Sequence, residues 1–155
     1  MDQSIAILLR MMDEAFDRKS WHGTNLRGSI RGLSADEAIW RPGSGRHNVW
    51  EVALHAAYWK YTVRRRLLGE KRGSFPLEGS NWFARDEADE ALWRSDVALL
   101  VATHRTLRDA VAQLAPRDLE KAASGGKTSI LTLVTGIAAH DLYHAGQIQL
   151  LKRMR

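Results

Sequence analysis

Apolar residues recur every three to four positions along four long segments of the chain, which is the period of an α-helix rather than of a β-strand. We expect these long helices over residues 3–22, 49–68, 86–115 and from about 128 to the end of the chain. A shorter helix is expected to end near Leu33, and the capping-box pattern from Ser34 to Glu37 predicts a brief one after it. Four helices that are each about 30 Å or longer predict an all-α protein, a four-helix bundle.

The second long segment is apolar on most of its sides, so we expect it to lie deep in the domain. Asn48 precedes it as a helix-capping residue, and Gly69 supplies its stop. Residues 70–85 predict a loop whose aromatic side chains favour packing against the rest of the domain. The chain shows no repeat, low-complexity tract or linker, so residues 1–155 are predicted to form a single domain.

The chain is basic, but the positions of its basic residues do not indicate nucleic-acid binding. A net charge of +5, from 23 basic and 18 acidic residues, invites comparison with nucleic-acid-binding proteins. However, the basic groups at residues 64–66, followed by Lys71 and Arg72, and at residues 152–155 fall near the expected ends of helices, where cations complement the helix dipole. We therefore expect no nucleic-acid partner. The alternative is that these basic groups form a binding patch for an acidic partner.

The lengths of the apolar segments indicate whether the chain could span a membrane or be exported. No stretch approaches the roughly 18 uncharged apolar residues of a membrane span, and the first residues lack the pattern of a signal peptide. We therefore expect no membrane partner and a cytoplasmic protein. The chain has no cysteine, which excludes disulfides, cysteine-ligated zinc, iron–sulfur clusters and a cysteine nucleophile.

Three histidines carry the most informative chemistry. His140 and His144 are four residues apart in the last helix, so their imidazoles lie on one face, which the apolar pattern turns inward. His55 lies midway along the second, most apolar segment and could face the pair from an adjacent helix. Three neutral imidazoles with an open fourth position are typical of catalytic zinc, and they also suit nickel, iron or copper. The metalloprotease motif HExxH is absent, because Asp141 follows the first histidine.

A structural interpretation of these histidines stays open. A pair at this spacing also arises by chance, and such residues are often hydrogen-bonded or half-exposed. A single histidine on an apolar helix is usually a core residue whose ring nitrogens find hydrogen-bond partners.

The segment His140-Asp141-Leu142-Tyr143-His144-Ala145-Gly146-Gln147-Ile148 resembles the signature of the DinB/YfiT-like proteins, which are metal-binding four-helix bundles. Further motifs in the order of that family are Trp21-His22-Gly23, Trp40-Arg41-Pro42, His47-Asn48-Val49-Trp50-Glu51 and Leu67-Leu68-Gly69-Glu70. The resemblance implies that His55, His140 and His144 bind a divalent metal such as zinc, nickel or iron. It also implies a homodimer, and a relation to transferases that use the thiols bacillithiol, mycothiol or glutathione.

Other residues are candidates for the surroundings of this site. His22 is expected either to line the mouth of the metal cavity or to cap a helix end. Asp141 is expected either to orient an imidazole or to form an outward salt bridge. Glu51 is assigned a capping role, with an oxygen ligand as the alternative. The side chains of Tyr58, Trp59 and Trp82 are assigned to packing or to a pocket wall, His47 to a loop or cap, and His104 to the core or its boundary.

These observations predict metal-dependent chemistry on a small molecule, either thiol transfer or hydrolysis. The chain offers no evident nucleophile, so the nucleophile is expected to arrive on the metal. The alternative is a non-enzymatic, metal-stabilised or metal-sensing dimer, which a fourth protein ligand from His22 or Glu51 would favour.

Overall fold

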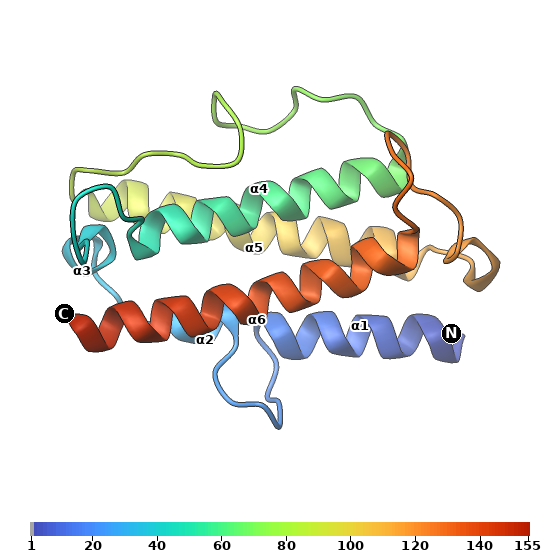
Figure 1. Ribbon diagram of the computed structural model, residues 1–155, viewed down its shortest axis with the longest axis horizontal. Coiled ribbons are helices and arrows are strands. Elements are labelled where there is room, and N and C mark those ends of the chain that lie inside the picture. The colour runs from blue at the N-terminus through green and yellow to red at the C-terminus, as the bar shows by residue number, and fades with distance from the viewer. Residues whose placement is uncertain (1) are drawn as a thin grey trace.

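Figure 1 shows the computed structural model, which describes residues 2–155. Its helices are α1 (Gln3–Phe16), α2 (Leu26–Ile30), α3 (Ala35–Ile39), α4 (Val49–Leu68), α5 (Glu90–Ala112) and α6 (Ile130–Met154), with a short 3-10 turn, η1 (Pro116–Asp118). No strand occurs in this part of the chain, so the predicted all-α class is confirmed. No helix within it is both long and apolar enough to cross a membrane.

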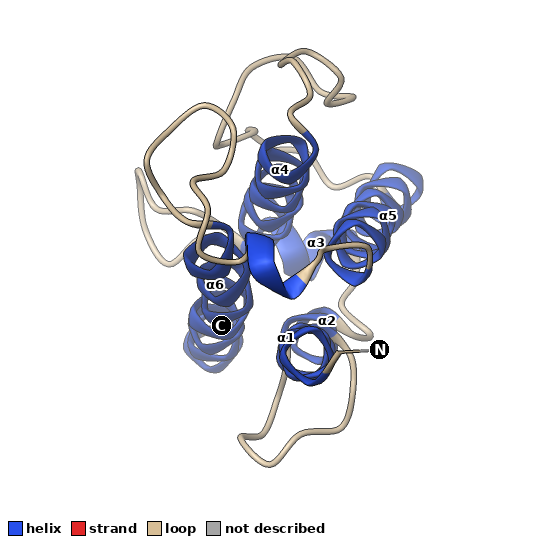
Figure 2. Ribbon diagram, turned by 90° about the vertical axis from the view of Figure 1, so that its right-hand side faces the viewer, coloured by secondary structure: helices blue, strands red, loops and turns tan. Residues whose placement is uncertain are grey.

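The four long helices form the bundle, seen end-on in Figure 2. Helix α4 packs against α5 and α6, and α1 packs against the other side of α5 and α6. The colours of Figure 1 show that α4 and α5 run in the same direction, whereas α6 runs back beside α4. Because α4 and α5 are parallel, residues 69–89 must return along the whole length of α4 before α5 begins. This return explains the long loop between them.

Two helices are shorter than their apolar pattern predicted. The predicted first helix, residues 3–22, ends at Phe16, its last buried residue. The following residues form an exposed loop, closed where the side-chain amide of Asn25 donates to the carbonyl of Arg18 at 2.8 Å. The predicted start at residue 86 moves to Glu90, because the Asp89 carboxylate caps the helix by accepting from the Leu92 N–H. In contrast, the predicted bounds of α4 are confirmed.

The middle of the bundle contains a small polar cluster between two apolar clusters. Lys60 on α4 forms an ion pair with Asp141 on α6, and both side chains are about fully buried. The Lys60 ammonium also lies 4.9 Å from the centre of the Phe16 ring. His104, on α5, stacks on the same Phe16 ring, with ring centres 3.8 Å apart. The predicted core position of His104 is therefore confirmed, next to charged groups rather than in a purely apolar setting.

His104 should make the stability of the fold depend on pH. Burial, reinforced by the charges of Lys60 and Arg108, lowers the pKa of His104 from 6.5 to about 2. Below about pH 6.5 the unfolded chain therefore binds a proton that the folded chain does not, so the free energy of unfolding decreases as the pH is lowered. Lowering the pH from about 7 to about 5 should decrease the free energy of unfolding of both the wild type and His104→Leu. We expect this decrease to be about 2 kcal/mol smaller in His104→Leu, which lacks the imidazole. Urea unfolding at both pH values, with a chelator present, measures this difference, and equal losses in the two proteins would contradict it.

Candidate metal centre

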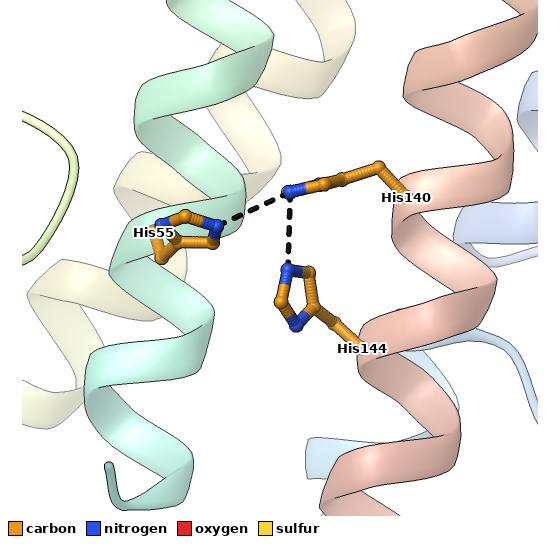
Figure 3. Close-up of side chains that lie close together, drawn as sticks. All are labelled: His55, His140 and His144. Atoms are coloured by element: carbon orange, nitrogen blue, oxygen red, sulfur yellow. Dashed lines mark hydrogen bonds between the residues drawn. The ribbon is translucent and has the colours of Figure 1, made fainter.

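The three predicted histidines converge between α4 and α6 (Figure 3). The Nε2 atom of His140 lies 3.2 Å from Nε2 of His55 and 3.0 Å from Nε2 of His144. Two nitrogens that are each about 2.1 Å from a tetrahedral ion lie about 3.4 Å apart. The observed spacing therefore fits a single small cation that is bound by all three rings. The i, i+4 spacing on α6 stacks His140 above His144, and the antiparallel packing of α4 brings His55 opposite them.

Hydrogen bonds at the far side of two rings orient their Nε2 lone pairs toward this point. The Nδ1–H of His55 donates to the carbonyl oxygen of Asn81 at 2.9 Å. The Nδ1–H of His144 donates to Oε1 of Gln147 at 2.6 Å. A neutral imidazole carries one N–H, so both Nε2 atoms are left as acceptors. His140 has only one proton to offer to two acceptors, whereas a cation satisfies all three nitrogens at once.

The histidines are suited to binding a cation at neutral pH. Burial, with smaller contributions from His144, His55 and Lys60, lowers the pKa of His140 to about 3. Burial also lowers the pKa of His144 to about 4, and that of His55 lies below its usual value of 6.5 for the same reason. All three imidazoles are therefore neutral near pH 7, the state in which imidazole binds metals.

Aromatic and charged residues support His55 from the side of the long loop. Trp82 stacks on His55, with ring centres 3.9 Å apart, and its other face stacks on His47 at 3.6 Å. His47 Nδ1 is 2.9 Å from Oε2 of Glu51. The Glu51 carboxylate also accepts two hydrogen bonds from Arg41, at 2.8 and 2.6 Å. Trp82 is therefore held between two imidazoles, one of which belongs to the converging group.

The structure does not bring Glu51 to the histidines as a fourth ligand. Burial would raise its pKa, but hydrogen bonds from Arg41, His47 and the Arg85 N–H outweigh burial and lower it to about 2. The carboxylate is thus fully engaged on the other side of Trp82. The backbone N–H of Glu51 donates to the Asn48 side chain, which confirms the predicted cap at Asn48. The capping role assigned to Glu51 is wrong, because its carboxylate binds Arg41, His47 and the Arg85 N–H.

The remaining candidates lie in different places. His22 is in the exposed loop after α1, with its ring 3.4 Å from the Ser20 hydroxyl, and it does not line the cavity at the histidines. Asp141 neither orients an imidazole nor forms an outward salt bridge, because its ion pair with Lys60 is internal. Tyr58 packs on Phe75 and Phe83.

Trp59 stands at the edge of the group. Its ring centre is 6.3 Å from that of His55 and 6.5 Å from that of His140, and both pairs meet edge-on. Its indole N–H donates to the Asn81 side-chain oxygen at 2.9 Å. Asn81, which has a left-handed φ of 66°, therefore contacts both Trp59 and His55.

A cavity of about 520 Å³ opens beside the three imidazoles. Its other walls are mainly apolar and include Val52, Trp82, Tyr143, Leu150, Leu151 and Met154. The polar side chains among its lining are Arg46, His47 and Gln147. A volume of this size accommodates a small organic molecule. His47, expected only in a loop or cap, therefore lines the cavity wall.

Sequence reasoning missed three residues that shape this site. Gln147 is three residues after His144, so helical spacing alone could have suggested the contact. Asn81 acts through a backbone carbonyl in an irregular loop, and no sequence pattern identifies such a group. Lys60 was assigned no role from the sequence, yet its side chain is 1% exposed and pairs with Asp141.

One of three comparisons with known proteins found a match. A model of the DinB superfamily matches residues 19–148, a range that includes all three converging histidines. Searches of curated proteins and of solved structures gave no match. Since the matched range covers most of the chain, and the helical architecture agrees with it, the chain belongs to the DinB superfamily.

Proposed function

We propose that His55, His140 and His144 bind one divalent metal ion, and that the protein is a metal-dependent enzyme acting on a small molecule. The observation that carries this proposal is the convergence of three Nε2 atoms at the wall of an apolar cavity. When bound, the metal would supply Lewis acidity, which lowers the pKa of a thiol or a water molecule and makes its anion available near pH 7. Thiol transfer is the reaction we favour, with hydrolysis as the alternative.

The donor set supports an enzyme better than a closed structural site. Within residues 2–155, the group that could hold a cation contains only these three residues, and Glu51 and His22 lie elsewhere. Three protein ligands leave room for a substrate, whereas structural zinc sites use four. The adjoining cavity gives that substrate access to the histidines.

Residues that line this cavity would bind the substrate and accept a proton from it. Val52, Leu150 and Leu151 would hold the apolar part of the substrate and exclude water. In a transfer reaction the thiol loses its proton, its sulfur bonds to an electrophilic carbon, and the leaving group departs with the electron pair. Two observations support His47 as the group that accepts this proton: it lines the same cavity, and its Nδ1 is 2.9 Å from the Glu51 carboxylate, which leaves Nε2 as the acceptor when Nδ1 carries the N–H.

Metal analysis followed by an activity screen tests this function. The chain is purified without a histidine tag, loaded with zinc, nickel or iron, and assayed with a low-molecular-weight thiol and a chromogenic aromatic electrophile. We expect turnover that disappears with a chelator and returns with the metal. A loaded protein that turns over neither this pair nor chromogenic esters would favour the non-enzymatic, metal-stabilised dimer instead.

Gln147 provides a separate test of the metal site. Gln147→Ala removes the acceptor that orients His144. We expect metal affinity to fall about 10- to 100-fold, as is usual when a ligand loses its orienting partner. Competition with a chromogenic chelator measures the change. Gln149→Ala is the matched control, because Gln149 is on the same helix but contacts Thr24. Equal affinities for wild type and Gln147→Ala would show that this contact does not support metal binding.

A further inference from the structure

A second cavity, of about 650 Å³, lies between the C-terminal half of α4 and the loop that returns along it. It shares no lining residue with the cavity at the histidines. Three arginines line it: Arg65 and Arg66 from α4, and Arg72 from the loop. Glu78 is the one acidic residue among its lining, so the charged side chains around it have a net charge of +2.

The positive charge of these arginines is not neutralised by neighbouring carboxylates. Arg65 donates to the carbonyl oxygen of Glu70 at 3.1 Å, and Arg66 donates to that of Ser124 at 3.0 Å. A carbonyl oxygen orients a guanidinium but leaves its charge in place. None of Arg65, Arg66 and Arg72 forms an ion pair within residues 2–155.

The adjacent Arg64 shows the contrasting arrangement. Its guanidinium makes two hydrogen bonds to the Glu70 carboxylate, at 3.1 and 2.9 Å. Arg41, Arg85 and Arg108 are also paired with carboxylates. Unlike these four residues, the three arginines around the second cavity have no carboxylate partner, so their charge is available to an anion.

Aromatic residues form another part of the same wall. Trp59 is 37% exposed, so part of its indole is free to contact a ligand. Phe75 meets Tyr58 edge-on and Tyr61 at a tilted angle, and these contacts bring the loop against α4. The Tyr61 hydroxyl accepts hydrogen bonds from the backbone N–H groups of Gly73 and Ser74, each at 3.2 Å. These contacts hold the loop wall beside Arg72 in place.

We propose that this cavity binds a small phosphate monoester that carries a planar aromatic group. A phosphate monoester has a charge of about −1.5 to −2 at neutral pH, which complements the net charge of the lining. Guanidinium groups bind phosphate oxygens through paired hydrogen bonds, and arginine and tryptophan also stack on planar rings. A single carboxylate supplies half of that charge, so it is the weaker ligand.

The site lies in line with the histidines along α4. His55, Trp59, Thr62 and Arg66 follow the i, i+4, i+7, i+11 spacing of one helix face. This spacing places Arg66 about 16 Å from His55 along the helix axis. The two sites also share the contacts of Asn81, whose side chain accepts from Trp59 and whose carbonyl accepts from His55. The phosphate site nevertheless depends only on the arginines and on Trp59.

Titration calorimetry with phenyl phosphate tests this site on the full chain, both as purified and after treatment with a chelator. We expect saturable binding in both preparations, with an affinity at least about tenfold higher than that of benzoate and no binding of phenol. Binding that disappears after chelation would place phenyl phosphate on a metal and overturn the proposal. Equal affinity for benzoate would overturn it as well.

Arg72→Gln is the decisive variant, because Arg72 is exposed and its side chain makes no hydrogen bond within the described chain, so its loss should not disturb the fold. We expect phenyl phosphate to bind at least about tenfold more weakly to this variant. Arg105→Gln is the matched control, since Arg105 is exposed on α5 and lies outside both cavities. An unchanged affinity in Arg72→Gln, or an equal loss in Arg105→Gln, would overturn the proposal.

Discussion

Replacing any one of His55, His140 and His144 by alanine is expected to abolish stoichiometric metal binding. The wild type should hold about one divalent ion per chain, because its three Nε2 atoms converge on one point. Each substitution leaves two imidazoles, which bind an ion much more weakly. Removing a residue that only orients a ligand lowers metal affinity by up to about 100-fold, and we expect the loss of a ligand itself to lower it further.

Elemental analysis of each variant, after dialysis against a weak chelator, measures this loss. His22→Ala is the matched control, because His22 is exposed and lies outside the cavity at the histidines. We expect His22→Ala to retain its metal. Full metal occupancy in all three single variants would show that these histidines are not the ligands, and an equal loss in His22→Ala would show that the effect is not specific.

Lys60→Met is expected to destabilise the fold by about 3–5 kcal/mol, because it leaves the Asp141 carboxylate buried without a counter-ion. Both side chains are 1% exposed, so water cannot solvate the remaining charge. Methionine retains most of the volume of the lysine side chain, so the effect reports the lost charge rather than a cavity. Urea unfolding in the presence of a chelator measures the free energy of unfolding without a contribution from bound metal.

The double variant Lys60→Met/Asp141→Leu shows whether that loss of stability comes from the unpaired charge of Asp141 or from the lost packing of the lysine side chain. Removing both charges together should restore most of the stability, since apolar groups of similar volume often replace a buried ion pair without cost. Lys121→Met is a control, because its ion pair with Asp118 lies at the surface and should contribute less than about 1 kcal/mol. If the double variant is as unstable as Lys60→Met, the packing of the lysine chain, and not its charge, stabilises this region.

The helices themselves were largely predictable, since they depend on local patterns. Helix α4 has the predicted bounds because Asn48 and Gly69 are strong local signals for its start and end. The capping box from Ser34 to Glu37 is present with both of its hydrogen bonds. The error at the end of α1 arose because polar residues beyond Phe16 are compatible with a helix, yet nothing in the bundle covers them.

The candidate site was predictable only in its central residues. The spacing of His140 and His144 places two imidazoles on one face of any helix. The position of His55 on the most apolar segment, together with the family resemblance, adds the third. The surroundings were not predictable to the same extent, because Trp82 and Asn81 reach His55 through a loop of irregular backbone. Asp141 was misjudged for a related reason: its partner Lys60 is 81 positions away in the chain.

The sequence by itself determined that this chain forms amphipathic helices and which histidines are available to a metal, because helical periodicity and residue chemistry are local properties. Only the tertiary structure decided that α4 and α5 run parallel, and it is this arrangement that lays the connecting loop along α4. That loop supplies Trp82 and Asn81 to the histidines and Arg72 to the second cavity. Such contacts join residues that are distant in sequence, so they arise from the packing of the whole bundle and not from any local pattern.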